Sequence, residues 1–333
     1  MEKVTGIKSV DFKIKAIGHG VVNWNGSPQL EFWKDGASKP TKVSNHNMPK
    51  LRGYSNIKDF WEDGSPKSYQ HPSSVDFSKV KLYISQNCIR HHLFRCEPYN
   101  LQSPELLKQP IKLLCSLVGL LRGYVIPKNE NKRTSPLLLT DFVDQLGNGN
   151  YEQMGQSGSK EKKENKDGKE SSNSIFSKTT FGDTEYIAYG SISIEQLQFI
   201  PLCADFGRQA YIVNNHSEGR EVAKALTKYL QETLGRENAL ATYHENYVRR
   251  GSIFDEGEQG ILLNDDAIDV LVNEMVDLIR DLNIKQAKGY MFVEDVSVDY
   301  NDGVGKDMLR IKHSPEKVNP EKGKEYAVYY EGK

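Results

Sequence analysis

The residues with the clearest chemical potential in this sequence lie between Ser85 and Arg95. Ser85 is a good N-cap, and apolar residues recur at helical spacing as far as Leu93, which predicts a helix that begins at Ser85. The first turn of a helix has unpaired N–H groups and a partial positive charge, and both suit a phosphate group. Arg90, His91 and Arg95 would add cationic or donor groups. The stretch therefore predicts an anion-binding helix start, and an ordinary solvated helix face is the alternative.

Charge is divided unevenly along the chain, although the net charge of the 333 residues is only −1. Residues 1–133 carry 21 Lys and Arg against 11 Asp and Glu, whereas the rest of the chain carries 23 against 34. This asymmetry indicates a polyanionic partner for the basic part, or copies of the chain that dock front to back. The alternative is that the two parts mix in the folded protein and their charges cancel locally.

Cysteine spacing and the length of apolar runs exclude several classes of protein. Cys88, Cys96, Cys115 and Cys203 show neither CxxC pairing nor histidines at zinc spacing, so they predict reduced structural thiols and no metal or cofactor. The first residues contain no apolar leader segment, and no apolar run has membrane length. We therefore expect a soluble, cytoplasmic protein without membrane contact.

The periodicity of apolar residues predicts strands near residues 10–17, 137–143, 184–202 and 288–300, and helices that start at Ser85 and Asn264. Their order is strand, helix, strand, strand, helix, strand. This is the α+β, ferredoxin-like or RRM-like layout, in which two helices back a four-stranded antiparallel sheet.

Three long insertions are predicted within this single domain of residues 1–333, at about residues 18–80, 144–180 and 203–260. The first insertion interleaves aromatic and cationic residues, as at Arg52 and Tyr54, and such mixtures hold single-stranded nucleic acid. An irregular minor core built on the same rings is the alternative.

Local signals predict further elements around the third insertion. Ser103 is expected to start a helix that is kinked at Pro110. A short strand is expected over residues 209–213, followed by a helix that Ser217 caps. Residues 236–260 are expected to be polar and irregular.

One strand carries a pattern typical of RNA-binding sheets. The segment Lys288–Asp295 follows the first half of the motif K/R-G-F/Y-G/A-F-V-x-F/Y, and it departs at Met291 and Asp295. Tyr290 and Phe292 would then stack on bases. The alternative is a buried strand, which uses the same rings.

Catalytic motifs are absent from the sequence. There is no Walker loop, no GxSxG and no HExxH. His91 and His92 are adjacent, so on a helix they point in different directions and do not share a metal easily. The acidic residues after Asn264 are explained by the charge preference of a helix start. The sequence therefore predicts a protein that is not an enzyme.

The segment Ser85–Phe94, which follows a strand that comes after a long insertion, resembles the backbone subunit of type I CRISPR surveillance complexes (Cascade). Within that group it is most similar to the variant I-F system and less similar to the I-D subunit. The resemblance covers the whole chain in layout, and it is specific in this segment and in the helix over residues 106–127.

The resemblance implies a shape like a right hand, with the sheet as palm and the insertions as fingers and thumb. It implies copies that stack head to tail along a guide RNA (crRNA), each thumb pressing on the RNA of its neighbour and displacing one nucleotide at regular intervals. The implied partners are the guide RNA, copies of the chain, other Cascade subunits at both ends, and the target DNA through the guide.

The family contacts guide phosphates at the start of the helix beside the palm, which here is Ser85, Gln86, Asn87, Arg90 and His91. Its glycine-rich turn after the first strand matches Gly18-His19-Gly20. Lys178, Arg208, Arg249 and Arg250 are further candidates from charge alone. The full set of residues predicted to bind RNA is Lys15, Gly18, His19, Gly20, Arg52, Ser85, Gln86, Asn87, Arg90, His91, Arg95, Lys178, Arg208, Arg249 and Arg250.

Two other functions stay open from the sequence. A type III-like backbone subunit would cut target RNA with Mg²⁺ and an aspartate in the finger loop, with Asp35 and Asp59 as the candidates. A free-standing RNA-binding module of the recognition-motif type would depend on Tyr290 and Phe292.

Overall fold

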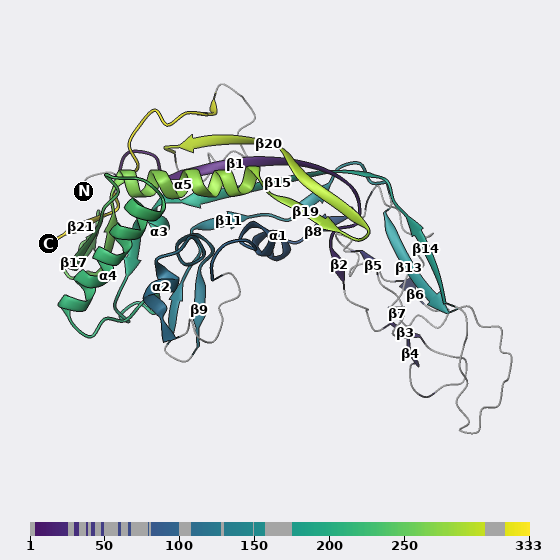
Figure 1. Ribbon diagram of the computed structural model, residues 1–333, viewed down its shortest axis with the longest axis horizontal. Helices are drawn as coiled ribbons and strands as arrows, with labels where there is room; N and C mark the ends of the chain where they lie inside the picture. The colour runs from purple at the N-terminus through teal and green to yellow at the C-terminus, as the bar shows by residue number, and fades with distance from the viewer. Residues whose placement is uncertain are drawn as a thin grey trace.

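The computed structural model describes residues 4–25, 81–99, 108–127, 130–148, 150–156, 175–303 and 317–333, together with short strands and single residues between 30 and 79. Long antiparallel strands run across the middle of the molecule, and helix α5 (Asp265–Arg280) lies along them (Figure 1). The N- and C-terminal ends lie at the same end of the molecule (Figure 1). A parallel bridge between Ile7 and Tyr326 joins the two terminal segments there.

A long antiparallel sheet has the strand order β19–β20–β1–β15–β12–β8, and β11 also pairs with β15. Every pairing in this sheet is antiparallel. Its strands are β1 (Ser9–Gly20), β8 (Tyr83–Ile84), β11 (Leu137–Leu139), β12 (Phe142–Asp144), β15 (Asp183–Ser193), β19 (Asn283–Gln286) and β20 (Gly289–Asn301).

Strand β1 is central because it pairs with β15 on one side and with β20 on the other. Val10, Phe12 and Ile14 are buried on one face of the strand, while Lys13 is exposed and Lys15 is partly exposed on the other. This is the alternation that the sequence predicts for residues 10–17, and it leaves one face of the sheet to pack against helices. Asp11 is the exception, because it is buried on the other face and accepts bonds from Ser191 and Asn301.

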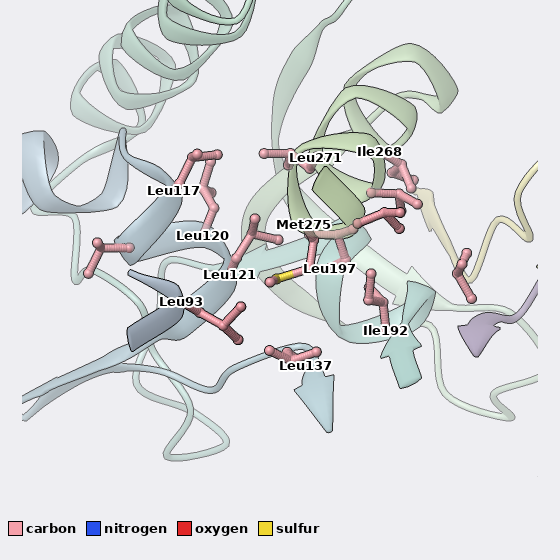
Figure 2. Packing of buried hydrophobic residues seen from close by; sticks show 14 of the residues in the cluster. Leu93, Leu117, Leu120, Leu121, Leu137, Ile192, Leu197, Ile268, Leu271 and Met275 are labelled. Carbon is pink, nitrogen blue, oxygen red and sulfur yellow. The ribbon is translucent and has the colours of Figure 1, made fainter. Parts of the chain in front are cut away.

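The main core lies between the long sheet and the helices. Figure 2 shows Leu121 of the helical turn η4 (Val118–Arg122) beside Met275 of α5, with Leu93 of helix α1 (Gln86–Leu93) and Ile192 of β15 in the same cluster. Leu93, Leu121, Ile192 and Met275 are among the buried residues of this cluster. The apolar stripes predicted for the two helices are therefore what fixes α1 and α5 against the sheet.

The predicted order of elements is found in the chain. When the insertions and the shorter elements between them are set aside, β1, α1, β11 with β12, β15, α5 and β20 occur in the order strand, helix, strand, strand, helix and strand. The α+β class and the antiparallel sheet are therefore confirmed.

A second sheet lies at the end of the molecule that holds the two termini (Figure 1). Its order is β16–β18–β17–β21, and its pairings are antiparallel. Helices α3 (Ile194–Gln198) and α4 (His216–Lys228), the turn η5 (Tyr229–Thr233), and the strands β16 (Phe199–Pro201), β17 (Ala241–Arg249), β18 (Glu258–Leu263) and β21 (Tyr330–Gly332) form this part. We call this part, with the loops that join its elements, the four-stranded sheet.

The prediction of an irregular stretch over residues 236–260 is wrong. Most of it is the hairpin of β17 and β18, and this hairpin is completed by β16 on one side and by β21 on the other. Because these strands carry many polar residues, the sequence shows no continuous apolar pattern that would predict them.

Two smaller predictions in this region also differ from the structure. Residues 209–213 form no strand, because single backbone bonds, such as Ala210 N–H to Pro201 O at 2.9 Å, replace a continuous ladder. Helix α4 begins at His216 rather than after Ser217. Asn215 is its N-cap, and the Asn215 side chain accepts a bond from the N–H of Glu218.

The region between the two sheets contains short helical turns and a ribbon. Helix α2 (Pro110–Leu114) has its proline at the first helical position rather than at a kink. The turn η4 ends at Gly123, whose φ of 78° places it in the left-handed region. Strands β9 (Tyr124–Ile126) and β10 (Asn131–Arg133) follow as a hairpin. The predicted start at Ser103 lies outside the described residues.

Short antiparallel ribbons lie in the first two insertions, at the end of the molecule away from the four-stranded sheet (Figure 1). They pair β2 with β5, β3 with β4, β6 with β7, and β13 with β14. Their bounds are β2 (Trp24–Asn25), β3 (Leu30–Phe32), β4 (Thr41–Val43), β5 (Met48–Pro49), β6 (Asp59–Phe60), β7 (Pro66–Lys67), β13 (Tyr151–Gln156) and β14 (Ile175–Thr180).

Candidate nucleic-acid interface

Helix α1 begins where the sequence predicts. Ser85 is its N-cap, and the Ser85 Oγ accepts a bond from the N–H of Cys88 at 3.4 Å. The carboxylate of Asp141 accepts a second bond, from the N–H of Gln86 at 3.0 Å. The N-terminal end of α1 is therefore already occupied in part by a carboxylate. A phosphate that binds here would need side-chain donors as well as the N–H groups of the helix start.

A polar stripe runs along the exposed side of α1 and into the turn that follows it. Asn87, His91 and Arg95 are all exposed, and they are spaced four residues apart. Asn87 and His91 are neighbours on the helix surface at this spacing, and Arg95 lies in the turn that follows Leu93, the last residue of α1. The Arg95 guanidinium also donates to Asn283 Oδ1 of β19 at 3.1 Å, which holds it against the long sheet. The stripe offers an amide, an imidazole and a guanidinium, which are all groups that bind phosphate oxygens.

Arg90 lies on the inner side of α1 and is half-buried. Its guanidinium donates to Ser135 Oγ at 2.9 Å and to the carbonyl of Leu137 at 2.5 Å, which joins α1 to β11. Burial lowers the pKa of Arg90, and the positive charge of Arg122 lowers it further. Both hydrogen-bond acceptors are neutral, so these bonds position α1 on the sheet without cancelling the charge of Arg90.

His92 lies beneath the polar stripe. Its Nδ1 is buried and has no hydrogen-bond partner. Burial lowers the pKa of His92, and the neighbouring His91 and Arg95 lower it further. The ring of His91 meets that of His92 edge to face at 5.2 Å between centroids. His92 is therefore a neutral packing residue near pH 7, and His91 is the imidazole that solvent reaches.

The segment Gly18-His19-Gly20 is explained by the packing of β1 against β20. A side chain at position 18 would place its Cβ 2.1 Å from the carbonyl oxygen of Tyr290, and Gly20 has a φ of 72°. The Nδ1 of His19 lies 3.0 Å from Asp183 Oδ1. These contacts give both glycines a structural reason, and RNA contact at this turn stays a prediction.

Lys15 lies further along β1 between two acidic neighbours. Its Nζ is 2.8 Å from Glu294 and 3.4 Å from Glu185. The hydrogen bond and the charge of these carboxylates raise the pKa of Lys15. This part of the sheet therefore has mixed charge rather than a basic surface.

The structure brings Arg208, Arg249 and Arg250 together on the four-stranded sheet, and each meets an acid. Arg249 donates to both oxygens of Glu195, at 2.7 and 3.3 Å. Arg250 lies 4.0 Å from Glu331. Arg208 pairs with the buried Glu258, and it also donates to the hydroxyl of Tyr330 at 3.3 Å. The positive charges of Arg208 and Arg249 are thus largely neutralised within the molecule, whereas the pair of Arg250 is long and exposed.

Sequence reasoning missed Arg133 of β10. This side chain is buried, and it donates to the carbonyls of Phe199 at 2.8 Å and Leu197 at 3.2 Å. Burial lowers the pKa of Arg133 to about 10. Arg133 lines a pocket of 270 Å³ together with Arg208 and Tyr330. Its neighbours lie more than 60 residues away in sequence, so no local signal reveals this role.

The rings of Tyr290 and Phe292 are exposed on β20, as a base-stacking strand requires. Their exposed fractions are 50% and 43%. The ring of His19 stacks against that of Tyr290 at 6.4 Å between centroids. The alternative of a buried strand is therefore wrong for these two positions, and the stacking role stays a prediction.

Some predicted residues cannot be placed in this interface. Arg52 and Asp35 lie outside the described residues, and so do the side chains of Asp59 and Lys178. Within the described ranges, no group of three or more His, Cys, Asp or Glu side chains is arranged to hold a metal ion. In those same ranges, no helix is both long enough and apolar enough to span a membrane.

A comparison with protein families decides what kind of chain this is. The family model described as type I-Fv CRISPR-associated protein Cas7fv-like matches residues 6–333. The chain belongs to the Cas7fv-like family. No curated protein matches the sequence. The predicted resemblance to the backbone subunit of a type I-F variant Cascade is therefore confirmed, and the match includes both sheets of this Cas7fv-like fold.

Proposed function

We propose that this chain holds the guide RNA of a Cascade complex by its sugar–phosphate chain, and that identical copies line up head to tail along that RNA. In this proposal the chain is a scaffold without catalytic activity, and it presents the spacer for pairing with target DNA. The family match over residues 6–333 carries the proposal. One kind of subunit must accept any spacer sequence, so its contacts should be mostly to phosphates.

The topology of the long sheet supports a palm of the RRM-like, ferredoxin-like kind. In such a fold the first and third strands are neighbours, and the fourth strand lies outside the first. Here β1 lies between β15 and β20, and β12 lies outside β15. In the proposal this sheet is the palm, and the insertions supply fingers and thumb.

The polar stripe of α1 is the part of the palm that we assign to the guide. Asn87, His91 and Arg95 are exposed side by side, and Arg90 fixes their helix on β11 from the inside. Arg90 is therefore a positioning residue in this proposal, and the stripe makes the contacts. Other Cascade subunits at the two ends of the filament belong to the proposal, as does target DNA held through the guide.

Purification of the full chain tests the proposal directly. A protein that holds guide RNA should carry nucleic acid with it, which its ultraviolet absorbance ratio and the length of the extracted RNA report. Binding of unrelated RNA sequences should have similar affinity, and log affinity should fall linearly with log salt concentration. Affinity that does not change between low and moderate salt would contradict phosphate binding.

A second candidate function is base stacking on the long sheet, and the exposure of Tyr290 and Phe292 favours it. In that case the double variant Tyr290→Ala/Phe292→Ala should lose affinity for RNA, whereas abasic RNA of the same length should bind the wild type and the variant equally. Equal affinity of the wild type for normal and abasic RNA would leave phosphate binding as the better account.

A further inference from the structure

The loop between β17 and β18 presents two large apolar side chains to solvent. Ile253 and Phe254 are adjacent in the chain, and their exposed fractions are 77% and 67%. Asp255 and Glu256 follow them directly and are also exposed. A paired apolar projection with acidic neighbours is unusual on a monomer surface, and such features mark contact sites. We call residues 252–256 the tip.

Hydrogen bonds hold the tip in a fixed shape. The side chain of Asn246 on β17 donates to the carbonyl of Asp255 at 3.0 Å and accepts from the N–H of Gly257 at 2.7 Å. The N–H of Phe254 donates to Ser252 Oγ at 3.1 Å. A loop that is already ordered loses less conformational entropy when it binds, so the tip is preorganised for a partner.

A groove of 530 Å³ lies between α4 and the start of β17. Ala223, Leu240 and Ala241 supply apolar lining, and Leu240 is 48% exposed although it is a leucine. Ala223 and Ala241 are themselves buried in the core, so the aliphatic surface that the groove leaves open to solvent is mainly that of Leu240.

The rim of the groove that α4 supplies is basic. Arg220, Lys224 and Lys228 lie at intervals of four residues, so they form one edge of the helix. Lys228 pairs with Glu232 at 3.7 Å, whereas within the described residues neither Arg220 nor Lys224 forms an ion pair. An apolar floor with a basic edge is the complement of an apolar tip with acidic neighbours.

We propose that the tip of one copy seats in the groove of the next copy, a contact that rests on the head-to-tail assembly proposed above. Ile253 and Phe254 cover the floor at Leu240, and Glu256 faces Arg220 and Lys224, because Asp255 is already paired with Lys333 of its own copy at 3.0 Å. The occupant is a second copy of this chain, because the chain itself carries a surface that complements the groove in its apolar side chains and in its charge.

The geometry of β17 prevents a copy from filling its own groove. The groove lies at the first residues of β17 and the tip follows its last residue, and the strand has nine residues. Such a strand spans roughly 25–30 Å. The contact is therefore between different patches on two copies, and a head-to-tail contact of this kind extends into an open chain of subunits unless its rotation closes a ring.

Paired variants of the full chain test this contact. Phe254→Asp breaks the tip, Lys224→Glu breaks the groove, and Leu146→Asp is a matched control that adds a negative charge at an exposed leucine elsewhere. Subunit association is measured by analytical ultracentrifugation over a range of protein concentrations. Each of the first two variants should need a roughly 10-fold or higher concentration to associate, and the control should not.

Mixing the two broken variants gives the sharper result. A Lys224→Glu copy has an intact tip, a Phe254→Asp copy has an intact groove, and one intact contact can form between them. The mixture should give dimers at concentrations where wild type forms longer chains, while each variant alone stays monomeric. Association of both variants like wild type would overturn the inference, as would a mixture that does not recover dimers.

A short RNA that one copy can cover separates this inference from the proposed function. Both variants should bind it as tightly as wild type, and their melting temperatures should match that of wild type. If Phe254→Asp weakens this binding but leaves association unchanged, the tip contacts RNA and the inference is wrong. If wild type associates as predicted but binds no RNA, the proposed function fails and the contact between copies stands.

Discussion

Arginine side chains are held differently in the α1 region and in the four-stranded sheet. In the α1 region, Arg90 donates to a hydroxyl and a backbone carbonyl, which are both neutral. In the four-stranded sheet, Arg208 and Arg249 donate to carboxylates. A carboxylate paired with an arginine has the opposite charge, so a distant phosphate feels little net charge from the pair. A neutral carbonyl only solvates the arginine and leaves its charge in place.

The difference indicates which cations can still attract a polyanion. Arg249 joins β17 to Glu195 of α3, and Arg208, in the loop after β16, binds Glu258 of β18 and Tyr330 of β21, so we expect little RNA affinity from either. The α1 region keeps the charge of Arg90 beside the polar stripe of Asn87, His91 and Arg95. The carboxylate of Asp141, which accepts from the N–H of Gln86, lies at the start of the same helix.

Substitution of Arg133 should give the largest loss of stability, because Arg133 is buried and its guanidinium is bound by carbonyls. Arg133→Ala removes the donors to the carbonyls of Phe199 and Leu197 and leaves a cavity. We expect it to lower the free energy of unfolding by roughly 3 kcal/mol, measured by urea denaturation. The neighbouring exposed Lys132 is the control, since Lys132→Ala should change stability by less than about 0.5 kcal/mol. A loss below 1 kcal/mol for Arg133→Ala would show that carbonyl binding contributes little here.

The polar stripe should give the largest effect on RNA binding. We expect the triple variant Asn87→Ala/His91→Ala/Arg95→Ala to weaken binding by about 10-fold or more for unrelated sequences and to reduce its salt dependence. Arg249→Ala should change affinity by less than about 2-fold, because Glu195 already neutralises that charge. Fluorescence anisotropy with labelled RNA measures both. Equal losses in the two regions would break the comparison.

Removal of the opposing carboxylate sharpens the comparison in the other direction. Asp141→Asn should tighten RNA binding by a few fold, because it removes a negative charge beside the proposed phosphate path. The same change should lower stability by about 0.5–1 kcal/mol, because Asp141 stabilises the start of α1. Glu195→Gln on the four-stranded sheet is the control. Affinity that stays unchanged in Asp141→Asn would place the RNA away from α1.

The smallest expected effect is a pH dependence of stability at His92. Its pKa is lowered in the folded protein, chiefly by burial, so the unfolded chain binds a proton more readily. The contribution of neutral His92 to stability is therefore fully present above the ordinary histidine pKa of about 6.5. It is lost as the pH falls from that value through the lower pKa of the folded state. Thermal melts at pH 7.5 and pH 5 should differ less in His92→Gln than in wild type. His91→Gln removes only the second cause, so it should reduce the difference by a smaller amount.

The long sheet was predictable because its signals are local. Alternation along β1, the N-caps Ser85 and Asn264 and the stripe of α5 all lie within single elements. The four-stranded sheet was not, because β21 joins β17 from about 80 residues away and no local pattern reveals such a pairing. A polar hairpin then looks like an irregular loop.

The candidate site was predictable in its location but not in the state of its charges. Residue types identified α1 as the cationic helix, yet the partner of Arg90 at Ser135 and that of Arg249 at Glu195 are 45 and 54 residues away. A sequence shows that an arginine is present, whereas its partner depends on the fold. Exposed neighbours such as Asn87 and His91 therefore become the better candidates once the structure is known.

The central position of β1 has a consequence for how the chain is made. Both neighbours of β1 follow it by more than 160 residues, so the ribosome releases this strand long before either of them exists. Until then β1 has two open edges that can pair with other nascent chains, and assembly by long-range pairing is slow. Synthesis that stops before β20 would therefore yield material that aggregates or needs a chaperone, rather than a shorter working subunit.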